Sequence, residues 1–206
     1  MPKIDFKKKH KSLYLPSSKQ VVLVDVPPLN FLMIDGQGDP NTSQDYKDAI
    51  EALFAVSYSL KFDIKNSAIS TDYIVMPLES LWWTPDGSGF NMERRDLWHW
   101  TAMIMQPTNV MTGHVEKAIT NAGKKKDLPA LPKMRFENFH EGHAAQILHV
   151  GPFSEEGAAI AKIHAFIASG GYKARGRHHE IYLSDFRKTA PGKLKTVIRQ
   201  PIDMHP

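Results

Sequence analysis

The sequence predicts an α+β fold made of duplicated strand-helix-strand-strand modules that form an antiparallel sheet, with helices on one face and a central groove on the other. Three observations predict this fold. The same order of extended and helical segments occurs in both halves, two strands in each half follow one another through a short loop, and 206 residues with 42% hydrophobic side chains can bury a sizeable core. Because parallel strands need a long crossover, the short loops favour an antiparallel sheet.

The first half follows a polar, mobile N-terminal segment, residues 1–19. The run VVLVDVPPLNFLMID is predicted to be extended and is interrupted by a proline pair. Asn41 or Thr42 can cap the next helix, whose apolar residues recur at steps of three and four. TDYIVMPLE and LWHWTAMIMQ are the following strands, joined by a turn rich in Gly, Pro and Asp at Pro85 to Gly89.

The second half repeats this order. HAAQILHVG is a strand, Ser154 can cap the helix that follows, and that helix ends at Gly170-Gly171. HHEIYLSD and LKTVIRQPI are the last two strands. A connector with a short helix, roughly Thr112 to Lys126, joins the two halves.

These segments predict a single domain over residues 1–206. It consists of two pseudo-repeats, about residues 20–107 and 140–203, joined by the connector at about residues 108–139. The two halves share little sequence, so the duplication is inferred from the matched order of their elements.

Composition excludes several classes of protein. The absence of cysteine removes disulfides, thiol nucleophiles and thiolate metal sites. The net charge of +4 is small, and basic residues are not interleaved with aromatic ones, so we expect no nucleic acid as a partner. No apolar run approaches the length of a membrane span, and none follows the basic N-terminus, so we expect no membrane partner and a cytoplasmic location.

Metal and cofactor chemistry is not indicated either. His178 and His179 are adjacent on a strand and point to opposite faces, which makes them poor joint metal ligands. The turn GQGDP lacks the third glycine of a dinucleotide fingerprint and the lysine of a P-loop, and no serine lies in a G-x-S-x-G elbow. We therefore expect no metal and no cofactor.

Strand alternation selects Glu180 as the candidate for any chemistry. Within HHEIYLSD, His178, Glu180 and Tyr182 share one face, and Ile181 and Leu183 lie on the other. The two aliphatic side chains suit a core covered by helices. Glu180 is therefore expected on the open face, with an imidazole and a phenol beside it.

Four tryptophans gather within nineteen positions of the chain. They are Trp82, Trp83, Trp98 and Trp100. Trp98 and Trp100 share a strand face that is opposite to that of Met103 and Met105. If the methionines pack beneath the helices, the two indoles lie on the open face with Glu180.

Two interpretations of these residues remain open. Aromatic surfaces remove water from a carboxylate, which makes it a stronger base and a better partner for a cation, and indoles supply flat apolar area. This pattern predicts a pocket for a flat, partly apolar molecule. In the structural alternative, Glu180 is solvated or pairs with Arg199 or Arg177, and the tryptophans pack in the core or in an interface.

Several segments together resemble the stand-alone GyrI-like small-molecule-binding proteins of bacteria. These segments are FLMIDGQGDPNTS, VMPLESLWW, WHWTAMIMQP, HVGPFSEEG and HHEIYLSDFRKTAPGKLKTVIRQPI. The resemblance runs from about residue 13 to residue 203 and is most specific in the C-terminal block. The family is similar to the ligand-binding domains of multidrug-responsive regulators such as BmrR and to the DNA gyrase inhibitor GyrI, and it implies a duplicated module around a central groove.

The resemblance also implies a function. In GyrI-like ligand domains an acidic strand residue of the second module lies at the floor of an aromatic-lined groove, and Glu180 stands at the matching position. Some stand-alone members are hydrolases of cyclopropanoid cytotoxins, the DNA-alkylating natural products of the yatakemycin and duocarmycin type. The residues before position 20 contain no helix-turn-helix segment, which favours an enzyme or a sequestering protein over a transcription factor.

For such a substrate, Glu180 is predicted to be the base that directs water at the strained ring, with Tyr182 or His178 as proton donor or orienting group. The residues predicted to bind the ligand are Trp82, Trp83, Trp98, Trp100, Glu180 and Tyr182. The alternative is a non-catalytic protein that sequesters drugs or modulates gyrase, in which Glu180 serves as a counter-charge. The sequence carries no signal for the oligomeric state.

Overall fold

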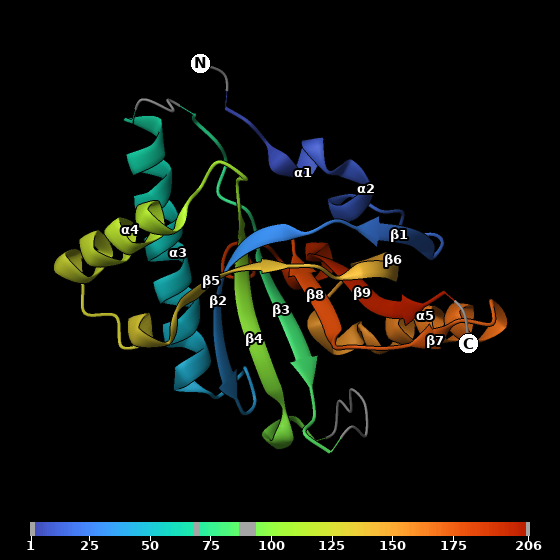
Figure 1. Cartoon of the computed structure of the whole chain (residues 1–206). Helices are drawn as coiled ribbons and strands as arrows, with labels where there is room; N and C mark the ends of the chain where they lie inside the picture. Colours follow the sequence, from blue (N-terminus) through green and yellow to red (C-terminus); the bar gives the residue numbers. More distant parts are fainter. Residues whose placement is uncertain (1–2, 68–70, 87–93, 205–206) are drawn as a thin grey trace. The chain divides into compact units, whose positions relative to one another are not determined.

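The computed structural model describes residues 3–67, 71–86 and 94–204 (Figure 1). Its contacts divide the chain into two compact units. The first unit contains Leu29–Leu78 and Trp82–Phe139 together with the first residues of the chain, and the second contains Lys7–Pro28, Glu79–Leu81 and His140–Pro206. Each unit is described by itself below.

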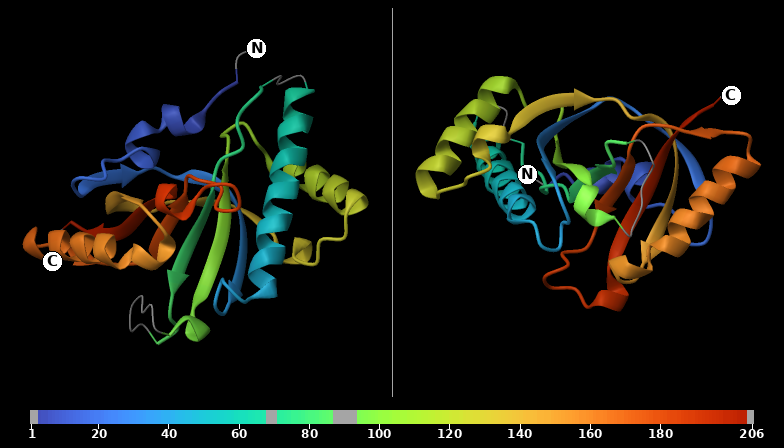
Figure 2. Two further views of the ribbon diagram at one scale, coloured as in Figure 1. Left: turned by 180° about the vertical axis from the view of Figure 1, so that it is seen from behind. Right: turned by 90° about the horizontal axis from the view of Figure 1, so that it is seen from below.

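The first unit is an antiparallel sheet with two helices. Its elements are β2 (Leu29–Gln37), α3 (Gln44–Lys65), β3 (Leu78–Trp83), β4 (His99–Gln106), α4 (Thr112–Lys125) and β5 (Arg135–Phe139). Within β3, Glu79–Leu81 belong to the second unit. The strand order is β3-β4-β2-β5. Helix α3 packs on β2 and β4, and α4 packs on α3, so a helical layer covers one face (Figure 2).

The second unit is also antiparallel and carries one long helix. Its elements are α2 (Lys11–Tyr14), β1 (Val22–Val26), β6 (Gly142–Val150), α5 (Gly157–Ser169), β7 (Lys173–Ala174), β8 (His178–Tyr182) and β9 (Lys195–Asp203), and α1 (Phe6–Lys9) precedes α2. The strand order is β1-β6-β9-β8, with β7 paired to β9. Helix α5 packs on β6 and β9 (Figure 2) through a core that includes Ile147, Ile163 and Ile198.

The predicted α+β class and the repeated order of elements are confirmed. The first unit contains β2-α3-β3-β4, and the second contains β6-α5-β8-β9. In each unit the last strand of the module pairs with the first strand, β4 with β2 and β9 with β6. The last segment of the predicted connector forms β5, which pairs with β2 and extends the first sheet.

The run VVLVDVPPLNFLMID forms two strands rather than one. The proline pair that lies between β1 and β2 cannot donate backbone hydrogen bonds, so it interrupts the ladder. Val22–Val26 then pairs with β6 in the second unit, whereas Leu29–Gln37 pairs with β4 and β5 in the first. A segment predicted as part of the first half is therefore divided between the two units.

Several local expectations need correction. The strand predicted in TDYIVMPLE begins only at Leu78, and Tyr73 forms an isolated bridge with Ile4 instead. The cap of α3 is Ser43, whose hydroxyl accepts from the Tyr46 backbone N–H at 3.2 Å, rather than Asn41 or Thr42. Part of the turn predicted at Pro85 to Gly89 lies outside the described residues.

The start of the second helix and the N-terminal segment also differ from expectation. Ser154 lies in a single 3₁₀ turn, Phe153–Glu155, and α5 begins after it at Gly157. The N-terminal segment, predicted to be polar and mobile, forms α1 and α2 and buries Leu13 and Tyr14. Across the part of the chain that the structure describes, no helix is long and apolar enough to cross a membrane.

Candidate functional site

The faces of β8 are set by its pairing with β9. Glu180 lies opposite Ile198, and Ile198 belongs to the core beneath α5. Paired residues on antiparallel strands share a face, so Glu180 lies on the face that α5 covers. The aliphatic pattern of the strand predicts Glu180 on the uncovered face, and that prediction is wrong. Ile181, on the opposite face, is also buried. The N-terminal segment lies on that face, where its backbone accepts hydrogen bonds from neighbouring side chains of the sheet.

Glu180 is held by its two neighbours on the same face. The Tyr182 hydroxyl donates to one carboxylate oxygen, Oε2, at 2.7 Å, and His178 Nε2 lies 3.2 Å from the other, Oε1. Glu180 is only 7% exposed and His178 4%. The alternation of the strand therefore brings together the three residues that the sequence predicted as the centre of the chemistry.

Two phenylalanines extend this cluster. The ring of Phe153 stands edge-on to that of Tyr182, with 5.7 Å between centroids, and Phe186 stands edge-on to Phe153 at 6.3 Å. Phe186 is 48% exposed. Sequence analysis did not single out either residue, since a lone Phe after a Gly-Pro turn or in a polar loop has no distinctive pattern. We call Glu180, His178, Tyr182, Phe153 and Phe186 the Glu180 cluster.

Among the described residues, Glu180 lacks the lysine or arginine partner that two other buried carboxylates, Glu141 and Asp72, have. Glu141 pairs with Arg199, and Asp72 pairs with Lys61 and Lys65. The ion pairs of the described residues give Glu180 no lysine or arginine, only His178. The alternative in which Glu180 pairs with Arg199 is therefore wrong, because that guanidinium is bound to Glu141.

Three of the tryptophans pack together in the first unit. Trp82 and Trp98 have ring centroids 5.3 Å apart, and Tyr46 at the start of α3 lies 5.5 Å from Trp82 and 4.9 Å from Trp100. All three indoles are buried. Trp83 instead lies beside His99, at 5.7 Å. The structure therefore brings Trp82, Trp98 and Trp100 together and separates Trp83 from them.

The faces of β4 are also the reverse of those expected. Trp100 contacts Tyr46, and Gln106 on the same face bonds to Ser57 of α3, so the indole face is the one that α3 covers. The methionines of β4 consequently point away from α3. Trp100 lies directly over Gly36, its partner across the strands, where a β-carbon would overlap the indole. No described residue accepts a hydrogen bond from the buried Trp100 Nε1.

A charged network fills the face of β8 opposite Glu180. His179 Nδ1 lies 2.9 Å from Glu141 Oε1, and Nε2 lies 3.0 Å from Glu79 Oε2. Ionised carboxylates only accept hydrogen bonds, so both ring nitrogens donate and the ring is an imidazolium. Arg199 donates to the second oxygen of Glu141 at 2.8 Å. These four residues, which we call the buried charge network, are at most 2% exposed.

The pKa values follow from this arrangement. Burial alone lowers the pKa of His179, but the charge of Glu141 and hydrogen bonds to both carboxylates outweigh it and raise the pKa to about 9. Burial alone raises the pKa of Glu141, yet His179 and Arg199 together lower it to about 2. Glu141 and His179 are therefore both ionised near neutral pH. Sequence analysis assigned no role to it, because its members come from distant parts of the chain.

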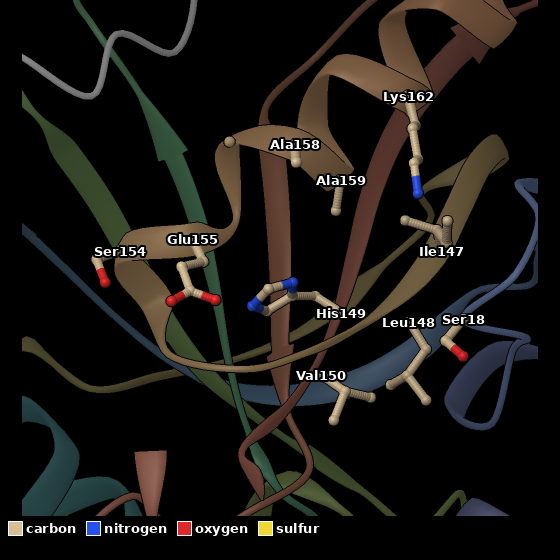
Figure 3. A pocket seen from close by; sticks show the side chains of 11 residues that line it. Ser18, Ile147, Leu148, His149, Val150, Ser154, Glu155, Ala158, Ala159 and Lys162 are labelled. Atoms are coloured by element: carbon tan, nitrogen blue, oxygen red, sulfur yellow. The ribbon is translucent and has the colours of Figure 1, made fainter. Parts of the chain in front are cut away.

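A separate groove lies at the start of α5 and encloses about 710 Å³ (Figure 3). His149 Nε2 lies 3.1 Å from the Pro152 carbonyl oxygen, so Nε2 carries a proton and donates to that oxygen. Figure 3 shows Glu155 pointing toward His149, with Lys162 reaching in from α5. None of the predicted site residues lines this groove, and most of its lining is exposed.

Within the described ranges, no three His, Asp or Glu side chains converge as a metal site. The Glu180 cluster, by contrast, joins a buried anion to aromatic rings, an arrangement that suits an organic ligand.

The comparisons identify the family. The GyrI-like small molecule binding domain matches residues 19–203, and the chain belongs to this family. An uncharacterized conserved protein from Listeria innocua is 39% identical, with a TM-score of 0.90, over 98% of this chain and 100% of that chain. A hydrolase from Listeria innocua is 37% identical, with a TM-score of 0.86, over the same shares.

More distant structures share the fold alone. The C-terminal domain of EcmrR is 12% identical, with a TM-score of 0.55, over 89% of this chain and 97% of that chain. No curated protein matches the sequence. The resemblance to the GyrI-like family, drawn from sequence segments, is thus confirmed.

Proposed function

We propose that the Glu180 cluster binds small aromatic molecules that carry a positive charge or a strong hydrogen-bond donor. The observation that supports this most is a carboxylate only 7% exposed whose partners, among the described residues, are a hydroxyl and an imidazole but no lysine or arginine. Burying an anion without a permanent cation is costly, so a cationic ligand would gain the compensation that the protein does not supply.

The aromatic neighbours define the shape of the ligand. The ring of Phe153 packs against Tyr182 and that of Phe186 against Phe153, and Phe186 is exposed enough to be covered by a ligand. Flat rings with delocalised charge gain both apolar burial and cation–π attraction on such surfaces. As a separate proposal, Trp82, Trp98 and Trp100 of the first unit supply apolar surface to an aromatic ligand, as the sequence predicted.

The proposed reaction is the hydration of a cyclopropanoid alkylating agent. Glu180 would take a proton from water while the water oxygen bonds to the strained ring carbon. The breaking carbon–carbon bond would deliver its electron pair through the conjugated ring to the carbonyl oxygen. That oxygen would take a proton from Tyr182 or His178, and Glu180 would return one to the donor, so the net change is the addition of one water.

The position of Tyr182 supports this assignment. Its hydroxyl already donates to Glu180, so a proton that Glu180 gains can pass to Tyr182 once Tyr182 has given its own to the substrate. His178 has an equivalent contact with the other carboxylate oxygen and is the alternative donor. Relatives described as hydrolases are consistent with an enzymatic role.

The competing proposal is a protein that sequesters drugs or modulates a partner such as gyrase without turnover. The lack of a lysine or arginine partner for Glu180 among the described residues supports this competing proposal equally. A carboxylate can bind a cationic drug without catalysing a reaction. Incubating the protein with a duocarmycin-type cyclopropanoid in molar excess separates the two. Conversion of more compound than protein to the hydrated product supports hydrolysis, whereas quenching of tryptophan fluorescence with unchanged compound supports sequestration.

The binding proposal itself is tested with ethidium, a flat aromatic cation, and phenanthridine, its neutral parent ring. Glu180→Gln is expected to weaken ethidium binding about tenfold or more and to leave phenanthridine binding nearly unchanged. Glu155→Gln, which removes an exposed carboxylate of the same unit, is the matched control and should change neither. Equal ethidium affinity of folded Glu180→Gln and wild type would refute the counter-charge role.

A further inference from the structure

The short helix α2 completes the buried charge network. The Tyr14 hydroxyl donates to Glu79 Oε1 at 2.8 Å. Arg199 donates through one nitrogen to the Leu13 carbonyl, also at 2.8 Å, and the Gln146 amide donates to the Ser12 carbonyl at 2.6 Å. Three consecutive residues of α2 therefore each satisfy a buried polar group of the sheet.

Each of these contacts would be hard to replace. Arg199 binds Glu141, Gln146 and the Leu13 carbonyl with different nitrogens, so loss of the carbonyl would leave a buried donor unpaired. Tyr14 is 1% exposed, and burial together with the charge of Glu79 raises its pKa well above the usual value. The phenol therefore stays protonated and remains a donor to Glu79.

We propose that Lys11–Tyr14 is a positioning element for the Glu180 cluster and that Tyr14 is its main positioning residue. His179 and Glu180 are consecutive on β8 and point to opposite faces, so the bonds that fix His179 on one face fix Glu180 on the other. Tyr14 acts on His179 through Glu79, which bonds both. The segment lies before residues 19–203, the stretch that matches the GyrI-like small molecule binding domain.

The first test does not depend on the proposed function. Tyr14→Phe removes only the hydroxyl, and Tyr58→Phe, at an exposed tyrosine of α3, is the matched control. In Tyr14→Phe we expect the imidazole N–H resonances of His179 to shift and the β8 amides to exchange faster with solvent. Resonances and exchange rates like those of Tyr58→Phe would overturn the proposal.

The second test rests on the proposed function and uses ethidium. Tyr14→Phe is expected to weaken ethidium binding by about three- to tenfold, although Tyr14 lies on the face opposite Glu180. Tyr14→Phe and Glu79→Gln should be non-additive in this affinity, because the two side chains share one bond. Unchanged affinity or additive effects would contradict the positioning role.

The two tests distinguish failure of the inference from failure of the proposed function. If the wild type does not bind ethidium, the proposed ligand class is wrong and the resonances and exchange rates alone decide the role of Tyr14. If the wild type binds ethidium and Tyr14→Phe binds it equally well, the positioning role is wrong and the ligand class stands.

Discussion

Glu141 is the residue through which the energetics of the buried charge network can be measured. One oxygen of its carboxylate accepts a hydrogen bond from His179, and the other accepts one from Arg199. Glu141→Gln keeps the size of the side chain but leaves two buried cations with Glu79 as their only carboxylate in the network. Breaking a buried ion pair by removing one partner costs about 3–5 kcal/mol.

The pKa of Glu141 gives an independent magnitude. Burial opposes ionisation, yet His179 and Arg199 lower the pKa from 4.5 to about 2. At about 1.36 kcal/mol per pKa unit, this difference corresponds to about 3 kcal/mol in favour of the ionised folded state. We therefore expect Glu141→Gln to lower the free energy of unfolding by about 3–5 kcal/mol near pH 6.

Urea unfolding followed by circular dichroism measures this change. Glu155→Gln is the control, because its carboxylate is exposed, and it should change the free energy of unfolding by less than about 0.5 kcal/mol. A loss below about 1 kcal/mol in Glu141→Gln would show that the two cations are compensated without this carboxylate, and the reasoning above would be wrong.

The same network predicts how wild-type stability depends on pH. The folded pKa of Glu141 lies below its ordinary value, so its contribution is complete above pH 4.5 and is lost as the pH falls toward 2. The folded pKa of His179 lies above its ordinary value, so its contribution is complete below pH 6.5 and is lost as the pH rises toward 9. The free energy of unfolding should therefore be greatest between these limits, and Glu141→Gln should flatten its acid side.

Three further substitutions test other parts of the structure. Gly36→Ala should destabilise the protein by about 1–3 kcal/mol, because the added β-carbon would overlap Trp100. The control is Gly113→Ala, which places a β-carbon in open space on α4 and should not destabilise the protein. Equal melting temperatures for the two variants would contradict this packing. Ser43→Ala should cost about 1 kcal/mol in urea unfolding through loss of the α3 cap, and no change would mean another group caps the helix. Tyr182→Phe should slow the proposed hydration with little loss of stability, and an unchanged rate would leave His178 as the donor.

The order of elements could be predicted from local patterns. Helical periodicity and capping residues depend on neighbours within a few positions, and the helices predicted in each half and in the connector are present as α3, α5 and α4. The grouping of His178, Glu180 and Tyr182 also follows from strand alternation alone. Boundaries were less accurate where a turn competes with the pattern, as at Ser154, which lies in a 3₁₀ turn rather than at the helix cap.

The choice of face was not predictable in the same way. Alternation separates Glu180 from Ile181 and Trp100 from Met103, but all four are buried, so hydrophobicity does not reveal which side the helix covers. The expected rule assigns aliphatic side chains to the helix face. That rule fails here because α2 and the buried charge network occupy the other face of the second unit.

The sequence by itself determined the α+β class, the repeated module, the family and the triplet around Glu180, since each depends on residues close together in the chain. Only the tertiary structure decided that the N-terminal segment is an ordered part of the second unit. Tyr14 meets Glu79 across 65 positions, and Leu13 meets Arg199 across 186. These long-range hydrogen bonds form because buried charged and polar groups need partners inside the protein. A pattern of neighbouring residues in the sequence cannot show which distant residue supplies the partner.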